Sequence, residues 1–261
     1  NLKLKFESFS CKVFEGSGHD YDFIDSFANF KSNLPKVMIA NTIKGNGVSF
    51  MEHTSMTEKE EYYKYHSGAP SAEEYSKASK EILNRIVVLS NSLKLQIPAP
   101  SKKYIQKKKT EINSEKMINS YSEYLLKYAE ENTNVVAMDA DLILDTGLIP
   151  FKNKYPKRYF QCGISEQDMV SQSGTMALSG LIPLVHSFSC FLTSRPIEQI
   201  YNNCLQGSKV IYLGSLSGLL PAGPGSSHQS VNDITSMASM GDINLFEPAS
   251  SCQLDYILDF S

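Results

Sequence analysis

A single glutamate at the start of a helix is the first residue in this sequence that could do chemistry. Glu166 lies in the segment Gly-Ile-Ser-Glu-Gln at 163–167, between an apparent strand over 158–162 and a helix of small residues that ends at Gly180. A helix N-terminus favours a carboxylate, and Ser165 is a plausible N-cap, so the residue has an ordinary structural interpretation. The same place also sets one carboxyl group beyond the end of a strand, where α/β proteins bind ligands.

Aromatic residues and histidines form a second group of candidates. Phe188, Phe191 and Arg195 belong to one segment, and His228 follows a Gly- and Pro-rich loop over 218–227 that can bring backbone close to a ligand. An aromatic face suits a flat heterocycle, and a histidine can pass a proton near neutral pH. Core packing for the phenylalanines, and a hydrogen bond to backbone for the histidine, are the alternatives.

The elements that must position these residues alternate regularly from residue 114 onward. Helices are predicted over 114–132, from 166, and over about 191–205; strands are predicted over 134–138, 158–162, 181–188, 209–213 and 244–247. Near-continuous apolar strands between helices predict an α/β fold, a parallel sheet sandwiched by helices. Glu166, Phe188, Phe191, Gly214 and His228 would then lie at or near the carboxyl edge of this sheet.

The first part of the chain reads as the end of another α/β domain. Residues 1–92 hold predicted strands over 12–15 and 36–40 and predicted helices over 22–31 and 72–89, with Asp20 at a helix start. Residues 93–112 are rich in Pro and Lys and read as a linker. Residues 113–261 make the second domain, and the chain reads as a piece of something longer.

Composition excludes several classes of function. The 261 residues are 41% hydrophobic with a net charge of -3, so they give no electrostatic footprint for nucleic acid, and no apolar run is long enough to span a membrane. Five scattered cysteines indicate neither a disulfide framework nor a zinc site and favour a reducing cytoplasm. The five histidines show no metal-ligand spacing.

Five segments in order resemble the transketolase family of thiamine diphosphate enzymes. They are Gly-His-Asp at 18–20, Thr-Ile-Lys-Gly-Asn-Gly-Val at 42–48, His-Ser-Gly-Ala-Pro at 66–70, Gly-Ile-Ser-Glu-Gln at 163–167, and Ser-His-Gln at 227–229. The resemblance implies that residues 1–92 are the last part of the PP domain, which holds the cofactor diphosphate through Mg²⁺. It implies that residues 113–261 are most of the Pyr domain, which holds the aminopyrimidine ring.

The resemblance also implies partners and limits. A homodimer is expected, with sites at the interface, acting on sugars or sugar phosphates. The family's Gly-Asp-Gly metal motif does not occur in this sequence. No metal-binding residue is therefore assigned, and the Mg²⁺ ligands are expected outside this chain segment.

Residue roles follow from the same resemblance. Glu166 would bond N1′ of the aminopyrimidine and favour the tautomer whose 4′-imino group takes the thiazolium C2 proton. Phe191, Phe188 and Asp141 match residues around the cofactor, and Arg195 matches a residue of a recurrent pattern, although an ion-pair role fits Arg195 equally. His66 and His228 match histidines that face the diphosphate or the reacting sugar.

Three departures from the family pattern bear on the substrate. By ungapped counting, Pro224 stands in place of a sugar-binding Asp, Leu216 in place of a histidine, and Asp145 where a Ser helps hold the sugar phosphate. Two like charges about 4 Å apart cost about 4 kcal/mol at an effective dielectric constant near 20, which is roughly a thousandfold in affinity. The sequence thus predicts transfer of a two-carbon ketol unit without the usual pentose phosphates.

Two other functions stay open from the sequence. The segment 188–195 is also compatible with a decarboxylating thiamine synthase of the deoxyxylulose-phosphate type. Leu216 and Pro224, in place of polar residues, permit a non-catalytic relative that keeps the fold and a dimer surface.

Overall fold

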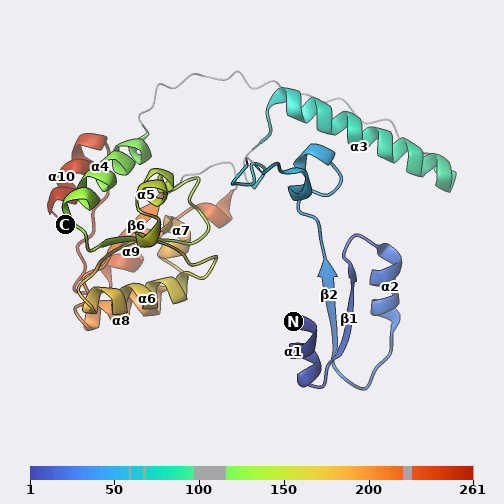
Figure 1. The fold of residues 1–261 in the computed structure, drawn as a ribbon, viewed down its shortest axis with the longest axis horizontal. Coiled ribbons are helices and arrows are strands. Elements are labelled where there is room, and N and C mark those ends of the chain that lie inside the picture. The colour runs from blue at the N-terminus through green and yellow to red at the C-terminus, as the bar shows by residue number, and fades with distance from the viewer. Residues whose placement is uncertain (59, 67–68, 97–115, 220–224, 261) are drawn as a thin grey trace. The chain divides into compact units, whose positions relative to one another are not determined.

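The computed structural model describes residues 1–58, 60–66, 69–96, 116–219 and 225–260. The chain divides into two compact units, Asn1–Ile105 and Gln106–Ser261, and each is described by itself (Figure 1). Most of the linker predicted over 93–112 lies outside the described residues, as do Pro224 and residues 67–68 of the His-Ser-Gly-Ala-Pro segment.

The first unit is built on one strand–helix–strand crossover. Strands β1 (Lys12–Ser17) and β2 (Lys36–Asn41) pair in parallel, and α2 (Tyr21–Asn29) connects them. A short helix, α1 (Leu2–Ser8), precedes β1. Asp20 caps α2 by accepting hydrogen bonds from the next helical amides, which confirms its predicted place at a helix start.

The loop after β2 requires a glycine, because one of its residues has a left-handed backbone conformation. Gly45 has φ +81°, and a Cβ there would lie 2.0 Å from the Met51 carbonyl oxygen, so a larger residue does not fit. Two 3₁₀ turns follow, η1 (Ser49–Met51) and η2 (His53–Ser55).

Helix α3 (Ala72–Leu93) completes the first unit. Ser71 and Glu74 form a reciprocal capping box at its start, as the predicted start signal requires. The predicted end at Leu89 is wrong by four residues, because the helix runs on until Lys94 takes a left-handed conformation.

The second unit is a four-stranded parallel sheet in the order β4-β3-β5-β6. Its strands are β3 (Val135–Asp139), β4 (Tyr159–Gln161), β5 (Ile182–Phe188) and β6 (Ile211–Ser215). The chain passes from β3 to one neighbour, β4, and then returns to the other side of β3 as β5. Beyond the carboxyl ends of β3 and β5 this reversal leaves the crevice in which open α/β sheets bind ligands.

Helices cover both faces of this sheet. Helices α4 (Met117–Glu131) and α10 (Ser251–Phe260) lie on one face and α6 (Glu166–Leu178) and α8 (Ile197–Leu205) on the other (Figure 1). Shorter helices are α5 (Ile149–Lys154), α7 (Ser189–Leu192) and α9 (Asp233–Ala238), and η3 (Pro156–Arg158) and η4 (Ser226–His228) are 3₁₀ turns. The predicted α/β fold with a parallel sheet between helices is confirmed.

The core of the second unit lies between the sheet and α6 and α8. Met138 of β3 and Val185 of β5 pack there against Met169 and Val170 of α6 and Ile200 of α8, and all five are fully buried. Neighbouring residues on each strand point to the opposite face, which α4 covers.

Two predicted elements of the second unit are wrong. The single helix expected over 191–205 is two helices, because Pro196 has no amide proton to continue the helical hydrogen bonds and disfavours helical backbone at the residue before it. The strand expected over 244–247 does not form: these residues are described but pair with no strand, and Leu245 and Phe246 are exposed. An apolar segment without a ladder partner cannot satisfy its backbone as a strand.

Candidate functional site

Glu166 is the first residue of α6, immediately after the loop that follows β4. Ser165 is the N-cap by position, but its hydroxyl makes no capping hydrogen bond. Glu166 is 2% exposed, which is unusual for a carboxylate in the first turn of a helix. A buried charge needs a partner, because desolvation without one costs several kcal/mol.

Arg195 is that partner and has a second contact. Its Nη1 atom lies 2.5 Å from Oε1 of Glu166, and its guanidinium carbon lies 3.9 Å from the centre of the Phe191 ring. The turn between α7 and α8 therefore places one cation between the buried carboxylate and an aromatic face. The ion pair that the sequence left as an alternative for Arg195 is present.

Two further predicted residues continue this series of contacts. The Phe191 ring lies 5.9 Å from the Phe188 ring and 5.1 Å from the His228 ring, and the Phe188 and His228 rings are 6.2 Å apart, all between centroids. We call these five residues, Glu166, Arg195, Phe191, Phe188 and His228, the carboxylate–aromatic cluster. They come from α6, from the turn between α7 and α8, from α7, from β5 and from η4, and the structure brings them into one series of contacts.

Asp141 and Asp145 lie on the loop that follows β3 and are exposed. Asp141 has φ +63°, and its backbone N–H donates to Oε1 of Gln161 at 2.9 Å. The backbone N–H of Asp145 donates to the Leu142 carbonyl oxygen. Both aspartates thus follow the carboxyl end of β3.

His66 belongs to the first unit and has its own neighbours. Its Nδ1 atom lies 2.9 Å from Nζ of Lys44, which also lies 4.5 Å from the centre of the Tyr63 ring. A lysine Nζ can only donate, so Nδ1 of His66 accepts and carries no proton in this contact. This leaves Nε2 of His66 as the protonated nitrogen.

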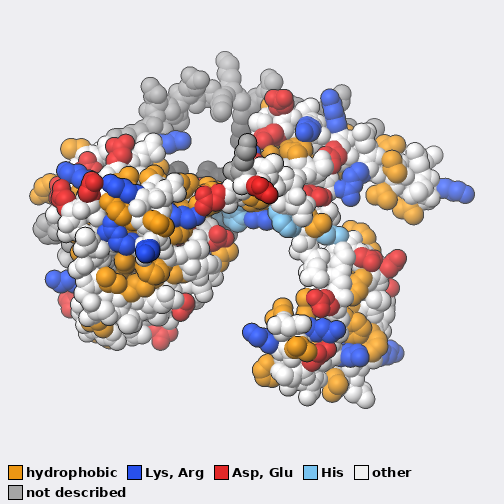
Figure 2. All heavy atoms as spheres, in the orientation of Figure 1, with side chains coloured by type: hydrophobic (Ala, Val, Ile, Leu, Met, Phe, Trp, Pro, Cys, Tyr) orange, Lys and Arg blue, Asp and Glu red, His pale blue; other side chains and the backbone are white. Residues whose placement is uncertain are grey.

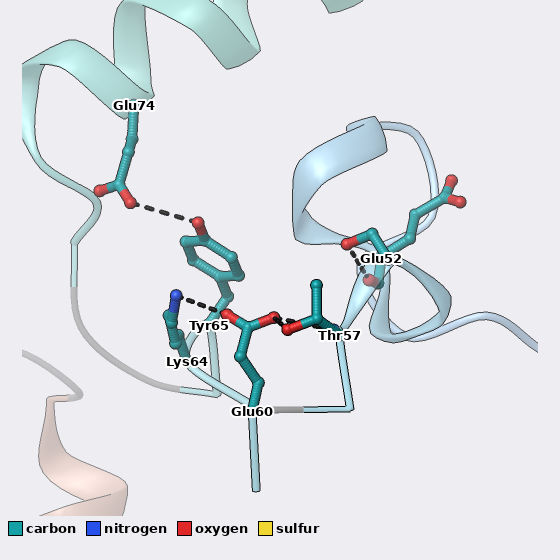
Figure 3. A network of polar contacts seen from close by, with 7 residues as sticks. Glu52, Thr57, Glu60, Lys64, Tyr65 and Glu74 are labelled. Atoms are coloured by element: carbon teal, nitrogen blue, oxygen red, sulfur yellow. Dashed lines mark hydrogen bonds and ion pairs between the residues drawn. The ribbon is translucent and has the colours of Figure 1, made fainter. Parts of the chain in front are cut away.

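A polar network holds the segment before His66 (Figure 3). Glu60 lies between Lys64, at 2.6 Å, and the backbone N–H of Thr57, at 3.0 Å, and the Tyr65 hydroxyl donates to Glu74 of α3 at 3.2 Å. The hydrogen bond from Lys64 is the main reason that the pKa of Glu60 falls to about 2. These contacts fix the two residues that precede His66.

Asp139 is a functional candidate that the sequence reasoning missed. It is fully buried at the end of β3 and accepts hydrogen bonds from Gln161 Nε2 at 2.9 Å and from the Leu142 N–H at 3.0 Å. Burial raises the pKa of Asp139 above its ordinary value, and these hydrogen bonds oppose that shift. The signal was present in the sequence as an aspartate directly after an apolar strand.

His186, to which the sequence analysis gave no role, is buried on β5 with two partners. Its Nδ1 atom lies 3.1 Å from the Met138 carbonyl oxygen, which can only accept, so Nδ1 carries the proton. Nε2 then accepts from the Tyr121 hydroxyl of α4 at 2.5 Å. Burial lowers the pKa of His186 to about 4, so the neutral ring joins β5 to α4.

A comparison with models of protein families shows the family to which this chain belongs. The family model described as "Transketolase, pyrimidine binding domain" matches residues 114–260, which is more than half of the chain. The chain belongs to the transketolase family. The match covers the whole carboxylate–aromatic cluster.

Two proteins of known name are similar in sequence to this chain. The "6-deoxy-6-sulfo-D-fructose transketolase subunit SqwH" of Clostridium sp. (strain MSTE9) is 31% identical over 137 residues, covering 52% of this chain and 42% of that protein. The 1-deoxy-D-xylulose-5-phosphate synthase of Tropheryma whipplei (strain Twist) is 35% identical over 136 residues, covering 51% of this chain and 21% of that protein. The chain spans less than half the length of each.

Solved transketolases share the fold over both units. The transketolase of Campylobacter jejuni matches 99% of this chain and 45% of its own with a TM-score of 0.53, at 17% identity. The transketolase of Leishmania mexicana matches with a TM-score of 0.52 at 14% identity.

In the described part of the chain, two kinds of feature were searched for and not found. No group of three or more His, Cys, Asp or Glu side chains is arranged to hold a metal ion. Among the described helices, none combines the length and apolar character needed to cross a membrane.

Proposed function

We propose that this chain forms part of a thiamine diphosphate-dependent enzyme that transfers a two-carbon ketol unit between sugars. The observation that carries the proposal is the buried carboxylate of Glu166, 2% exposed, in one series of contacts with Phe191, Phe188 and His228. Membership of the transketolase family supports it, since the family match includes all of these residues.

The cluster fits an aminopyrimidine ring. Arg195 occupies Oε1 of Glu166 and one face of the Phe191 ring. We therefore assign Oε2 of Glu166 to the ring nitrogen N1′, and the other face of Phe191 to stacking on the heterocycle. When bound, thiamine diphosphate would supply a carbanion at C2 of its thiazolium ring, and Glu166 would share a proton with N1′, which favours the reactive tautomer.

His228 and His66 complete the proposed machinery. His228, against Phe188 and Phe191, would donate a proton or a hydrogen bond to a developing alkoxide of the sugar. His66, with Lys44 beside it, would face the diphosphate or the sugar. Because the family's Gly-Asp-Gly metal motif does not occur in this sequence, we expect the Mg²⁺ ligands outside this chain segment.

Asp145 is the residue that we assign to substrate choice. A carboxylate facing a phosphate about 4 Å away costs about 4 kcal/mol at an effective dielectric constant near 20, roughly a thousandfold in affinity. We propose a sugar without phosphate at that end, or a nucleotide-linked sugar, as acceptor. Turnover of xylulose 5-phosphate with ribose 5-phosphate that equals or exceeds turnover with such acceptors would overturn this assignment.

The first test is hydrogen–deuterium exchange at C2 of thiamine diphosphate with the native protein and Mg²⁺. We expect fast exchange, and a fall of about 10²- to 10⁴-fold in Glu166→Ala, as for the loss of a general acid–base group. Asp168→Ala is the matched control, because Asp168 is a carboxylate in the same helical turn but is exposed and bonded to Gln172. Exchange without acceleration in the native protein would favour the non-catalytic relative.

A second candidate, the decarboxylating synthase, is favoured by the relatives of that name, one of them 35% identical. Both reactions need the same C2 carbanion, so C2 exchange does not separate them. Release of CO₂ from pyruvate, measured with the same preparation, would favour the synthase. Ketol transfer without CO₂ release would favour the transferase.

A homodimer in the cytoplasm is the remaining part of the proposal. All five cysteines are free thiols, which suits a reducing compartment. Sedimentation equilibrium of the native protein tests the dimer, and a monomer at micromolar concentration would contradict it.

A further inference from the structure

One glutamine contacts two loops that carry proposed site residues. Gln161 is the last residue of β4. Its Nε2 donates to Oδ2 of Asp139, while its Oε1 accepts from the backbone N–H of Asp141 and from that of Gly163, each at 2.9 Å. A single side chain therefore joins the loop after β3 to the loop that leads into α6.

Asp139 fixes which way the glutamine amide points. The buried Asp139 carboxylate accepts from the Leu142 N–H at 3.0 Å, the Tyr159 hydroxyl at 3.3 Å and the Thr146 hydroxyl at 3.4 Å. An ionised carboxylate can only accept, so the glutamine must turn its NH₂ group toward it. The amide oxygen is then directed at the two backbone N–H groups.

Both of those N–H groups belong to residues with left-handed backbone. Asp141 has φ +63° and Gly163 has φ +71°. For a residue other than glycine this conformation costs about 1–2 kcal/mol, so the loop at Asp141 needs outside support. Glu166 follows Gly163 by three residues, and the turn at Gly163 sets where α6 begins.

We propose that Gln161 is a positioning residue, anchored by Asp139, that locks the Asp141 loop and the Gly163 turn in one arrangement and so holds Glu166 and Asp141 in register. The inference rests on the proposed function for its catalytic consequence. Its structural part, the restraint of two backbone amides, can be measured without cofactor.

The structural test is amide hydrogen exchange by NMR on the full chain. In Gln161→Leu we expect the Asp141 and Gly163 amides to lose about fivefold to tenfold in protection, the value of one net hydrogen bond each. Amides of the β3–β5 ladder should be unchanged, which shows that the variant folds. Gln172→Leu is the matched control, because the Gln172 amide bonds Asp168 within α6.

Swapping the amide and the carboxylate between Gln161 and Asp139 distinguishes a positioning role from simple packing. Gln161→Glu keeps an oxygen for the two N–H groups but sets a second carboxylate against Asp139. Adding Asp139→Asn returns a donor to the pair, so the double variant should regain most of the protection that Gln161→Glu loses. The same order should hold for C2 exchange of thiamine diphosphate at saturating cofactor, with a fall of about tenfold in Gln161→Leu and little change in the dissociation constant.

Two results would overturn the inference. One is full protection of both amides in Gln161→Leu; the other is a double variant no better than Gln161→Glu. If native protein does not accelerate C2 exchange, the proposed function fails, while the amide measurements still decide the role of Gln161.

Discussion

At the scale of single residues, the second unit pairs each buried polar group discussed above with a specific neighbour. Glu166 is matched by the charge of Arg195, and Asp139 by several donors. His186 is matched by one donor and one acceptor, which keeps its ring neutral. The neutral state of His186 affects stability, because in mildly acidic solution the unfolded chain binds a proton on His186 that the folded chain does not bind.

The pH dependence of unfolding should reveal His186. Its pKa is about 4 when folded and about 6.5 when unfolded, so between these values the unfolded state binds more protons. The free energy of unfolding should therefore fall as pH drops from 6.5 to 4, by about 3 kcal/mol from this group. Urea unfolding between pH 7 and 4.5 measures it.

His186→Gln provides the control for that experiment. Glutamine can donate to the Met138 carbonyl oxygen but does not titrate, so the variant should show a shallower dependence on pH in this window. Equal slopes for native protein and variant would show that His186 is not the group responsible.

At the scale of elements, the packing of α6 on α8 places Glu166. Gly174 lies in the middle of α6, where glycine usually weakens a helix. A Cβ there would lie 2.0 Å from Oδ1 of Asn203 in α8. Asn203 is itself held by bonds to the Val170 carbonyl oxygen and the Tyr212 hydroxyl, so it has little room to move.

Gly174→Ala should therefore destabilise the protein although alanine is the better helix former. Helix propensity favours alanine by about 1 kcal/mol, but overpacking costs about 1–3 kcal/mol, and the clash with Asn203 is severe. We expect a net loss of about 1–2 kcal/mol in urea unfolding. In an Asn203→Ala background the same change should cost at least about 1 kcal/mol less, and an unchanged cost would contradict the contact.

At the scale of the whole molecule, the two units differ in how much they bury. Among the described residues, Val48 and Ala78 are the only buried hydrophobic residues of the first unit, whereas the second has a continuous core. Helix α3 exposes apolar residues along its length, including Ile82, Leu83 and Val88, and orange side chains are visible on it in Figure 2. The hydrophobic burial in the first unit is too small to offset the conformational entropy that this unit would lose on folding by itself.

The two units should therefore behave differently when expressed separately. Residues 106–261 should unfold cooperatively on heating, with the full chain as control. Residues 1–105 should show no cooperative transition by circular dichroism. A sharp transition in the shorter piece would show that the first unit has enough core to fold by itself.

Much of this architecture could be predicted from the sequence. Alternating apolar strands and amphipathic helices gave the parallel sheet, and Asp20 and Ser71 marked two helix starts because capping is a local interaction. The positions of Glu166, Phe191 and His228 beyond the sheet followed from their places after strands. The strand expected over 244–247 failed because a strand needs a partner, which a local pattern does not supply.

The sequence by itself determined the fold class, the transketolase resemblance and the main candidate residues, since these depend on local pattern and on the order of short segments. Tertiary structure decided that Arg195 bonds Glu166, that Asp139 and Gln161 join two loops, and that His186 is neutral. The contacts of Arg195 with Glu166, of Gln161 with Asp139 and of His186 with Tyr121 join residues that are 29, 22 and 65 positions apart in the sequence. Packing in three dimensions determines which residues make these contacts, and the spacing of residues along the chain does not predict the pairs.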